Sequence, residues 1–102
     1  MKLAWSSLAK QELQELKELR RYSAERWGRD VAQRYLEDVR DAAKQVSADP
    51  LCARPLKGPF RILRIRSHYL ILHVDGGADR VTIARLLHAA MDIERHLPRS
   101  NG

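Results

Sequence analysis

The residues best suited to binding an anion are five basic side chains within a short span of the sequence: Arg54, Lys57, Arg61, Arg64 and Arg66. No acidic residue lies between Pro50 and Val74. Because side chains alternate between the two faces of a strand, Arg64 and Arg66 would lie on one face and Arg61 on the other. Such a run serves either as a charged edge that discourages contact between sheets or as a surface for an acidic partner or a phosphate. The residue types alone leave these alternatives open.

Arg85 and His88 belong to the most apolar segment of the chain. An unpaired guanidinium would be costly there, so we expect Arg85 to meet water, a ligand or a helix carboxylate such as Glu37 or Asp38. His88 ends the same segment. An imidazole can act as a general base, but no activating partner is evident in the sequence, and a polar residue that simply ends a strand is the plainer interpretation.

Other chemistry has little support. His68, His73 and His96 have neither metal-ligand spacing nor cysteine neighbours, and no glycine-rich phosphate loop opens a helix. We therefore expect no metal and no cofactor. The single cysteine, Cys52, cannot form an internal disulfide, which suits a reducing compartment.

The elements that would position these residues begin with a sheet over residues 59–92. Three apolar runs are separated at Ser67-His68 and at residues 75–79, a pattern that predicts an antiparallel β-meander. The second break begins with Asp-Gly-Gly, and glycine tolerates positive φ. We expect the chain to reverse there and to pair the run ending at Val74 with the run starting at Val81.

Two amphipathic helices are predicted before the sheet. The first starts near Leu8, after a Ser6-Ser7 cap, and ends at Trp27-Gly28. The second starts within a few residues, where Asp30 and Gln33 have capping-box spacing, and ends before Pro50. Its apolar stripe consists of Val31, Ala32, Tyr35, Leu36, Val39, Ala42, Ala43 and Val46.

Three shorter segments complete the prediction. Residues 2–5 form a short strand that could join the sheet, residues 51–59 form an irregular connector, and residues 91–97 form a last short turn of helix before a frayed tail. Since the helices supply the apolar surface that can cover the sheet, we predict an α+β fold. It is a single domain over residues 1–102, with an N-terminal helical hairpin packed on one face of a small antiparallel β-sheet.

The charge is concentrated in the half that holds the sheet. The net charge is +6 and the pI is about 10.0. Residues 1–50 carry ten basic and nine acidic groups, whereas residues 51–102 carry nine and four. This balance favours an anionic partner. The first residues lack an apolar signal-peptide core and no run has membrane-spanning length, so we expect a cytoplasmic protein.

Several of these features together resemble the RelE/ParE toxin superfamily. They are the short first strand, Tyr22 and Trp27-Gly28 around the hairpin turn, Ala32 and Tyr35-Leu36 in the second helix, and residues 67–73 and 80–92. Residues 83–92, IARLLHAAMD, resemble the strand ending of the ParE branch. The resemblance covers nearly the whole chain and implies the toxin of a type II toxin–antitoxin pair.

Two activities are known in this superfamily, since RelE-like members cut messenger RNA on the ribosome and ParE-like members poison DNA gyrase. The ribonuclease branch commonly has basic residues after the His88 position and an aromatic residue just past the Asp92 position. This chain has Ala89-Ala90 and Ile93 there. The resemblance therefore implies a gyrase inhibitor that acts by binding rather than by its own chemistry. The alternative is a RelE-like ribosome-dependent mRNA endoribonuclease that uses Arg61, Arg64, Arg85 and His88.

The resemblance also implies a ParD-like antitoxin whose acidic and apolar C-terminal segment folds on binding. We expect that segment to cover the helical hairpin and a sheet edge. The partner-binding residues predicted on the basic half are Arg61, Arg64, Arg66 and Arg85. A third interpretation is a small basic adaptor domain with no toxicity, whose arginines bind an acidic protein.

Overall fold

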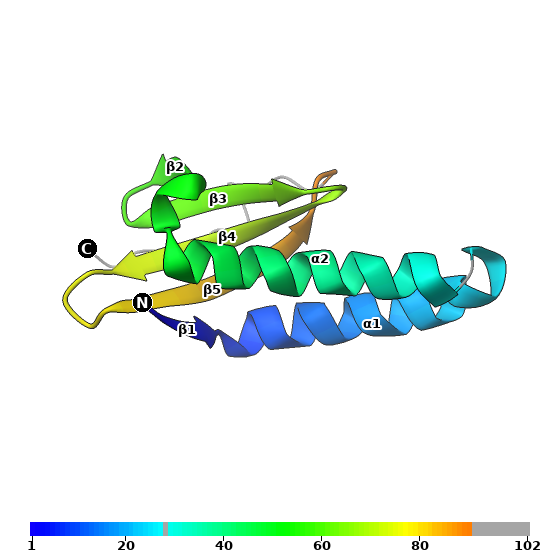
Figure 1. Ribbon diagram of the computed structural model, residues 1–102. Coiled ribbons are helices and arrows are strands. Elements are labelled where there is room, and N and C mark those ends of the chain that lie inside the picture. Colours follow the sequence, from blue (N-terminus) through cyan, green and yellow to red (C-terminus); the bar gives the residue numbers. More distant parts are fainter. Residues whose placement is uncertain (28, 91–102) are drawn as a thin grey trace.

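The computed structural model describes residues 1–27 and 29–90, and the side chains of these residues except those of 19–32. The elements in chain order are β1 (Lys2–Trp5), α1 (Ser7–Trp27), α2 (Arg29–Ala48), a short 3-10 helix η1 (Pro50–Cys52), β2 (Arg54–Lys57), β3 (Phe60–Ile65), β4 (His68–Asp75) and β5 (Arg80–His88) (Figure 1). The predicted turn of helix at residues 91–97 and the predicted frayed tail lie outside the described residues.

The sheet has five strands in the order β1-β5-β4-β3-β2. Strands β2 to β5 pair antiparallel with their neighbours, and β1 pairs parallel with β5. Figure 1 shows α1 and α2 side by side on one face of this sheet. The predicted α+β fold, with an N-terminal helical hairpin on one face of a mostly antiparallel sheet, is confirmed.

The β-meander also has the predicted pairing, because Val74 lies opposite Val81. The reason given for the turn between β4 and β5 was wrong in one respect. Positive φ occurs at Asp79, with a value of 53°, and at neither of the two glycines in the loop. Aspartate tolerates this left-handed conformation better than most residues, and the Asp75 carboxylate accepts a hydrogen bond from the Ala78 N–H at 3.1 Å.

The start of α1 and the end of α2 lie where the sequence predicts them. Ser6 Oγ accepts a hydrogen bond from the Ala9 N–H at 3.0 Å, as the predicted cap requires. Helix α2 ends at Ala48, before Pro50, as predicted. The segment 51–59 was wrongly expected to be irregular, because it contains the end of η1 and all of β2.

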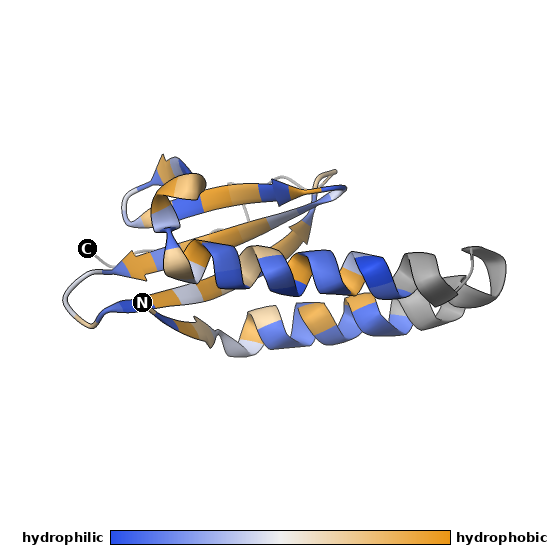
Figure 2. Cartoon of the chain, in the orientation of Figure 1, coloured by the Kyte–Doolittle hydropathy of each residue, from blue (hydrophilic) through white to orange (hydrophobic). Residues whose placement is uncertain are grey.

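The main core lies between the helices and the sheet. Tyr35, Val39 and Val46 from the predicted stripe of α2 are buried there against Leu70, Leu72, Val81 and Ile83. A second buried cluster, formed by strand residues, consists of Phe60, Ile62, Ile71, Ala84 and Leu87. Figure 2 shows the corresponding alternation of apolar and polar residues along the helices and strands. Because apolar side chains occur on both parities of the central strands, β3 to β5 contribute to two buried clusters.

Candidate functional site

Arg85 forms a two-point ion pair with Glu12 of α1. Its Nε and Nη2 donate hydrogen bonds to the two carboxylate oxygens at 3.0 and 2.9 Å. The exposed fractions of the two side chains are 14% and 13%. The expectation that Arg85 meets Glu37 or Asp38 was wrong, although a helix carboxylate is indeed its partner.

A β-bulge lies next to Arg85 in β5. The pairing of β4 with β5 shifts between Ile71 and Leu72, so that Ile71 lies opposite Arg85 and Leu72 lies opposite Ile83. The extra residue, Ala84, places Arg85 opposite Ile71, which belongs to the second buried cluster. Arg85 still meets Glu12, because β1 ends at Trp5 and Glu12 lies at the edge of β5 beyond that point.

Side chains of Ser6 and Glu12 hydrogen-bond the edge of β5 beyond the point where β1 ends. The pairing of β1 with β5 ends at Trp5 and Ile83. Beyond that point Ser6 Oγ donates to the Ala84 carbonyl at 2.7 Å, and a carboxylate oxygen of Glu12 accepts from the Leu86 N–H at 3.0 Å. Two side chains from the start of the hairpin thus satisfy backbone groups that a longer β1 would have bonded.

Arg61 has an internal role in the structure. Its Nε donates hydrogen bonds to the carbonyls of Pro50 and Ala53, at 3.1 and 3.0 Å. These carbonyls belong to the first residue of η1 and to the residue that follows it, so the guanidinium of a β3 residue holds the connection between α2 and β2. The side chain is half-buried.

The expectation that Arg64 and Arg66 share a face was wrong, because Arg64 lies on the side of β3 opposite to α2 and Arg66 lies in the turn that follows, against α2. The exposed Arg64 donates from Nε to the Arg66 carbonyl at 2.9 Å, and its guanidinium lies 5.7 Å from the centre of the Tyr69 ring. Arg66 has a φ of 53°. Its guanidinium pairs with Asp38 of α2 at 2.7 Å and lies over the Tyr35 ring at 5.3 Å. The turn is therefore attached to α2.

His88 lies next to a second histidine that the sequence analysis had set aside. It faces His68 across β4 and β5, and the ring centres are 5.2 Å apart in an edge-to-face arrangement. The Tyr35 hydroxyl hydrogen-bonds His68 Nδ1 and lies 2.9 Å from Ser67 Oγ. His88 Nδ1 accepts from the Ala90 N–H at 3.1 Å, which leaves its other ring nitrogen outside this bond.

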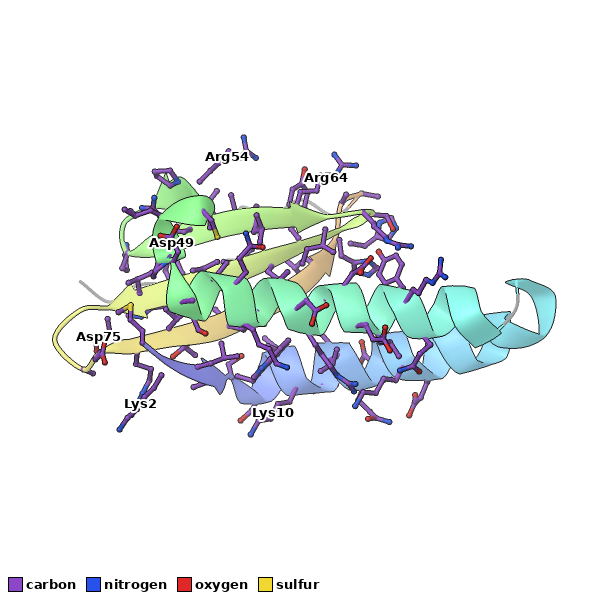
Figure 3. All side chains as sticks on the ribbon, in the orientation of Figure 1. Lys2, Lys10, Asp49, Arg54, Arg64 and Asp75 are labelled. Carbon is purple, nitrogen blue, oxygen red and sulfur yellow. The ribbon has the colours of Figure 1, made fainter. Side chains whose placement is uncertain are left out.

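The predicted site residues therefore form two groups. Arg64, Arg66 and His88 belong to the end of the sheet formed by the β3–β4 turn and the end of β5, but they lie on different sides of it. Arg66 contacts Asp38 and Tyr35 of α2, whereas Arg64 lies beside Tyr69, which packs against the second buried cluster. Arg61 lies further along β3, opposite Leu72, and Arg85 lies toward α1. Figure 3 shows Arg64 and Arg54, another residue of the predicted basic run, projecting outward from the β2–β3 side of the molecule. This end of the sheet, with Tyr35 and His68 added, is the candidate functional surface.

Sequence reasoning missed Glu12, Tyr35 and His68 as partners of the predicted residues. Tyr35 was read as a core residue, and it is 4% exposed. Its hydroxyl nevertheless needs hydrogen-bond partners, and that need was a signal for polar residues nearby. Among the described residues, no group of three or more His, Cys, Asp or Glu side chains is placed to hold a metal ion. None of the described helices is long and apolar enough to cross a membrane.

The architecture defines a class of protein, the RelE/ParE fold. One solved structure of this shape, from the chromosomal ParDE toxin–antitoxin system of Pseudomonas aeruginosa, superposes with a TM-score of 0.68 and 19% identity, over 86% of this chain and 95% of that one. The YoeB/ParE toxin from Agrobacterium tumefaciens superposes with a TM-score of 0.63 and 19% identity, over 86% and 98% of the two chains.

Sequence comparison identifies the branch. Residues 3–93 match the family described as the ParE toxin of the type II toxin–antitoxin system parDE. Toxin ParE1 of two Mycobacterium tuberculosis strains is 33% identical over 76 residues, which cover 72% of this chain and 76% of that protein. The chain belongs to the ParE family of type II toxin–antitoxin toxins.

Proposed function

We propose that this ParE-family toxin halts growth by inhibiting DNA gyrase, and that a ParD-like antitoxin neutralises it. The family match over residues 3–93 supports the general class of toxin. The observation that carries the choice of target is the engagement of Arg61 and Arg85 within the fold. These are two of the four residues that the ribonuclease alternative needs.

Arg85 illustrates the argument most clearly. A ribonuclease needs cations that can approach the scissile phosphate and stabilise the charge that develops there. Arg85 is 14% exposed and is bound at two points by Glu12. Turning toward a phosphate would leave the Glu12 carboxylate largely buried and without its cation, which is costly. A toxin that acts by binding its target through surface complementarity does not require Arg85 to leave Glu12.

The charge distribution supports the antitoxin. The chain carries a net charge of +6, and Arg54, Lys57 and Arg64 are exposed on the strands β2 and β3. An acidic segment that folds on binding would be steered toward such a surface. The related Pseudomonas aeruginosa structure is named for a ParDE toxin–antitoxin system. The proposal places the protein in the cytoplasm, where its target works.

The paired histidines favour a second candidate, messenger RNA cleavage on the ribosome. His88 is exposed, His68 lies beside it, and Arg64 and Arg66 belong to the same end of the sheet. Two imidazoles can divide the roles of general base and general acid, and nearby guanidinium groups can bind a phosphate. In this alternative His68 replaces Arg85 among the residues that the sequence suggested.

A supercoiling assay tests the proposal. Purified toxin is added to gyrase, ATP and relaxed plasmid, and the supercoiled product is measured over a range of toxin concentrations. We expect supercoiling to fall with toxin and to recover when the antitoxin is added first. Undiminished supercoiling at a toxin concentration well above that of gyrase would refute the proposed target.

A further inference from the structure

Three exposed cations lie along the side of the sheet that β2 and β3 form. Arg54 and Lys57 belong to β2, and Arg64 belongs to β3. None of the three forms an ion pair within the described part of the chain. Figure 3 shows Arg54 and Arg64 projecting outward on the same side of the molecule. We call these three residues the basic strip.

The strand register gives the basic strip a regular spacing. Lys57 lies opposite Phe60 and Arg54 lies opposite Ile62, and Arg64 follows Ile62 by two residues on β3. Because a strand rises about 3.3 Å per residue, the three cations follow one another at steps of about 6.6 Å along the sheet. Each strand of duplex DNA carries one phosphate per about 3.4 Å of helix axis, so alternate phosphates are about 6.8 Å apart along the axis. The two spacings agree.

Arg64 keeps the terminal nitrogens of its guanidinium outside its bond to the protein. Its Nε donates to the Arg66 carbonyl at 2.9 Å, and the guanidinium lies 5.7 Å from the centre of the Tyr69 ring, which helps to hold the side chain in place. A guanidinium can bind a phosphate at two points. No acidic residue lies between Pro50 and Val74, so no carboxylate of this segment repels a phosphate.

The edge formed by β2 distinguishes DNA from an acidic protein segment. Alternate carboxylates of an extended segment would also match the spacing of the strip, but such a segment binds a sheet edge most favourably when it joins as a further strand. Strand β2 contains Pro55, which has no N–H, and its pairing with β3 shifts between Pro55 and Lys57. These features disfavour strand addition. A phosphate backbone needs only the cations, so the edge favours a nucleic acid.

We propose that the basic strip binds the phosphate backbone of double-stranded DNA, and that this contact helps to hold the toxin on the complex of gyrase with DNA. The second half of this inference rests on the proposed gyrase target. Phosphate contacts carry no sequence information, so the binding is independent of DNA sequence. Electrostatic steering of an acidic antitoxin acts over a distance and does not require the antitoxin to dock on the strip.

The salt dependence of DNA binding tests the contact without gyrase. Purified toxin is titrated into a short, fluorescently labelled DNA duplex, and the anisotropy is measured at several salt concentrations. Three phosphate contacts predict a slope of about −2.7 for the logarithm of the binding constant against the logarithm of the salt concentration. That slope corresponds to a loss of about 40-fold in affinity between about 50 and 200 mM salt. Binding that does not depend on salt would overturn the proposal.

Two variants with the same loss of positive charge locate the contact. The strip variant carries Arg54→Gln, Lys57→Gln and Arg64→Gln. The control variant has three substitutions at exposed positions outside the strip, namely Lys2→Gln, Lys10→Gln and Arg40→Gln. Figure 3 shows Lys2 and Lys10 on the side of the molecule opposite to Arg54 and Arg64. Circular dichroism establishes that both variants are folded.

We expect the strip variant to lose at least about 10-fold in affinity for the duplex at about 50 mM salt, with a slope close to zero. The control variant should stay within about 2-fold of the parent in both respects. Equal losses in the two variants would show that only the net charge attracts DNA and would overturn the proposal. So would a strip variant that binds DNA as the parent does and instead loses affinity for the antitoxin, since the strip would then be a protein-docking surface.

The gyrase assay gives the second readout. We expect the strip variant to need at least about 10-fold more protein than the control variant for half-maximal inhibition. If the toxin binds DNA through the strip but leaves gyrase unaffected, the gyrase target is wrong and the DNA contact stands. If gyrase is inhibited equally by the parent and the strip variant, the role of the strip on the gyrase complex is wrong and the target stands.

Discussion

Arg85 of β5 and Glu12 of α1 form a two-point ion pair that also closes the edge of the sheet. The carboxylate of Glu12 accepts from the guanidinium and from the Leu86 N–H. The pair therefore connects the helical hairpin to the strand that carries the most ParE-like part of the sequence. A residue that looked like a candidate for phosphate binding contributes to the packing of hairpin on sheet.

Glu12→Ala should destabilise the protein strongly. It leaves a largely buried guanidinium without its anion and the Leu86 N–H without an acceptor, and we expect the free energy of unfolding to fall by about 3 to 5 kcal/mol. Urea denaturation followed by circular dichroism measures this change. Glu15→Ala, at an exposed position on the same helix, should change it by less than about 0.5 kcal/mol. Similar values for the two variants would show that the ion pair matters little.

Replacing Arg61 by alanine should lower the free energy of unfolding more than replacing Arg64 by alanine. Arg61→Ala removes the donor to the Pro50 and Ala53 carbonyls, and we expect a loss of about 1.5 to 3 kcal/mol. Arg64→Ala removes an exposed side chain and should cost less than about 1 kcal/mol. The same urea titration measures both. A stable Arg61→Ala variant with weakened toxicity would instead assign Arg61 to the target surface.

Gly58 and Gly76 form a matched pair for testing backbone conformation. Gly58 has a φ of 55°, and an added Cβ would meet nothing within 4 Å at either position. Gly58→Ala should therefore cost about 1 to 2 kcal/mol for conformational reasons alone. Gly76→Ala should be neutral or stabilise by about 0.5 kcal/mol, because the unfolded chain loses freedom. Thermal unfolding of the two variants gives the comparison, and equal melting temperatures would contradict this account of the β2–β3 turn.

His88→Ala distinguishes a binding toxin from a ribonuclease. His88 is exposed and belongs to neither buried cluster, so the variant should fold. We expect growth inhibition, titrated with an inducible promoter, to remain within about 10-fold of the parent, whereas loss of an acid–base catalyst typically costs about 10²- to 10⁴-fold. Lys10→Ala, an exposed position on α1, is the control. A loss of the larger size confined to His88→Ala would support messenger RNA cleavage.

The fold was largely predictable because the apolar periodicity and the residues that end helices and strands agree along this chain. The described part of the α2 stripe, the helix ends at Trp27 and before Pro50, and the Val74–Val81 pairing all come from local signals. Strand β2 escaped prediction because it is only four residues long and contains a proline. Such a segment forms a strand here because β3 supplies a partner, which is a tertiary effect.

The site was less predictable because its geometry depends on features that have no sequence period. The partner of Arg85 is Glu12, 73 positions away in the chain, which lies at the edge of β5 where β1 has ended. The pairing of His68 with His88 required the register of β4 on β5. Arg61 and Arg64 share a residue type and a run of sequence, yet they have different roles in the structure. Arg61 bonds the Pro50 and Ala53 carbonyls, whereas Arg64 is exposed.

The most direct measurement of the central claim is the accumulation of broken DNA by gyrase in the presence of this toxin. Gyrase, supercoiled plasmid and purified toxin are incubated, then treated with detergent and protease, and linear DNA is quantified on a gel with and without the antitoxin. We predict linear, protein-linked plasmid that rises with toxin concentration and disappears when the antitoxin is present. A preparation that stops growth in cells, yields no linear DNA and cuts messenger RNA on ribosomes would contradict the proposed target.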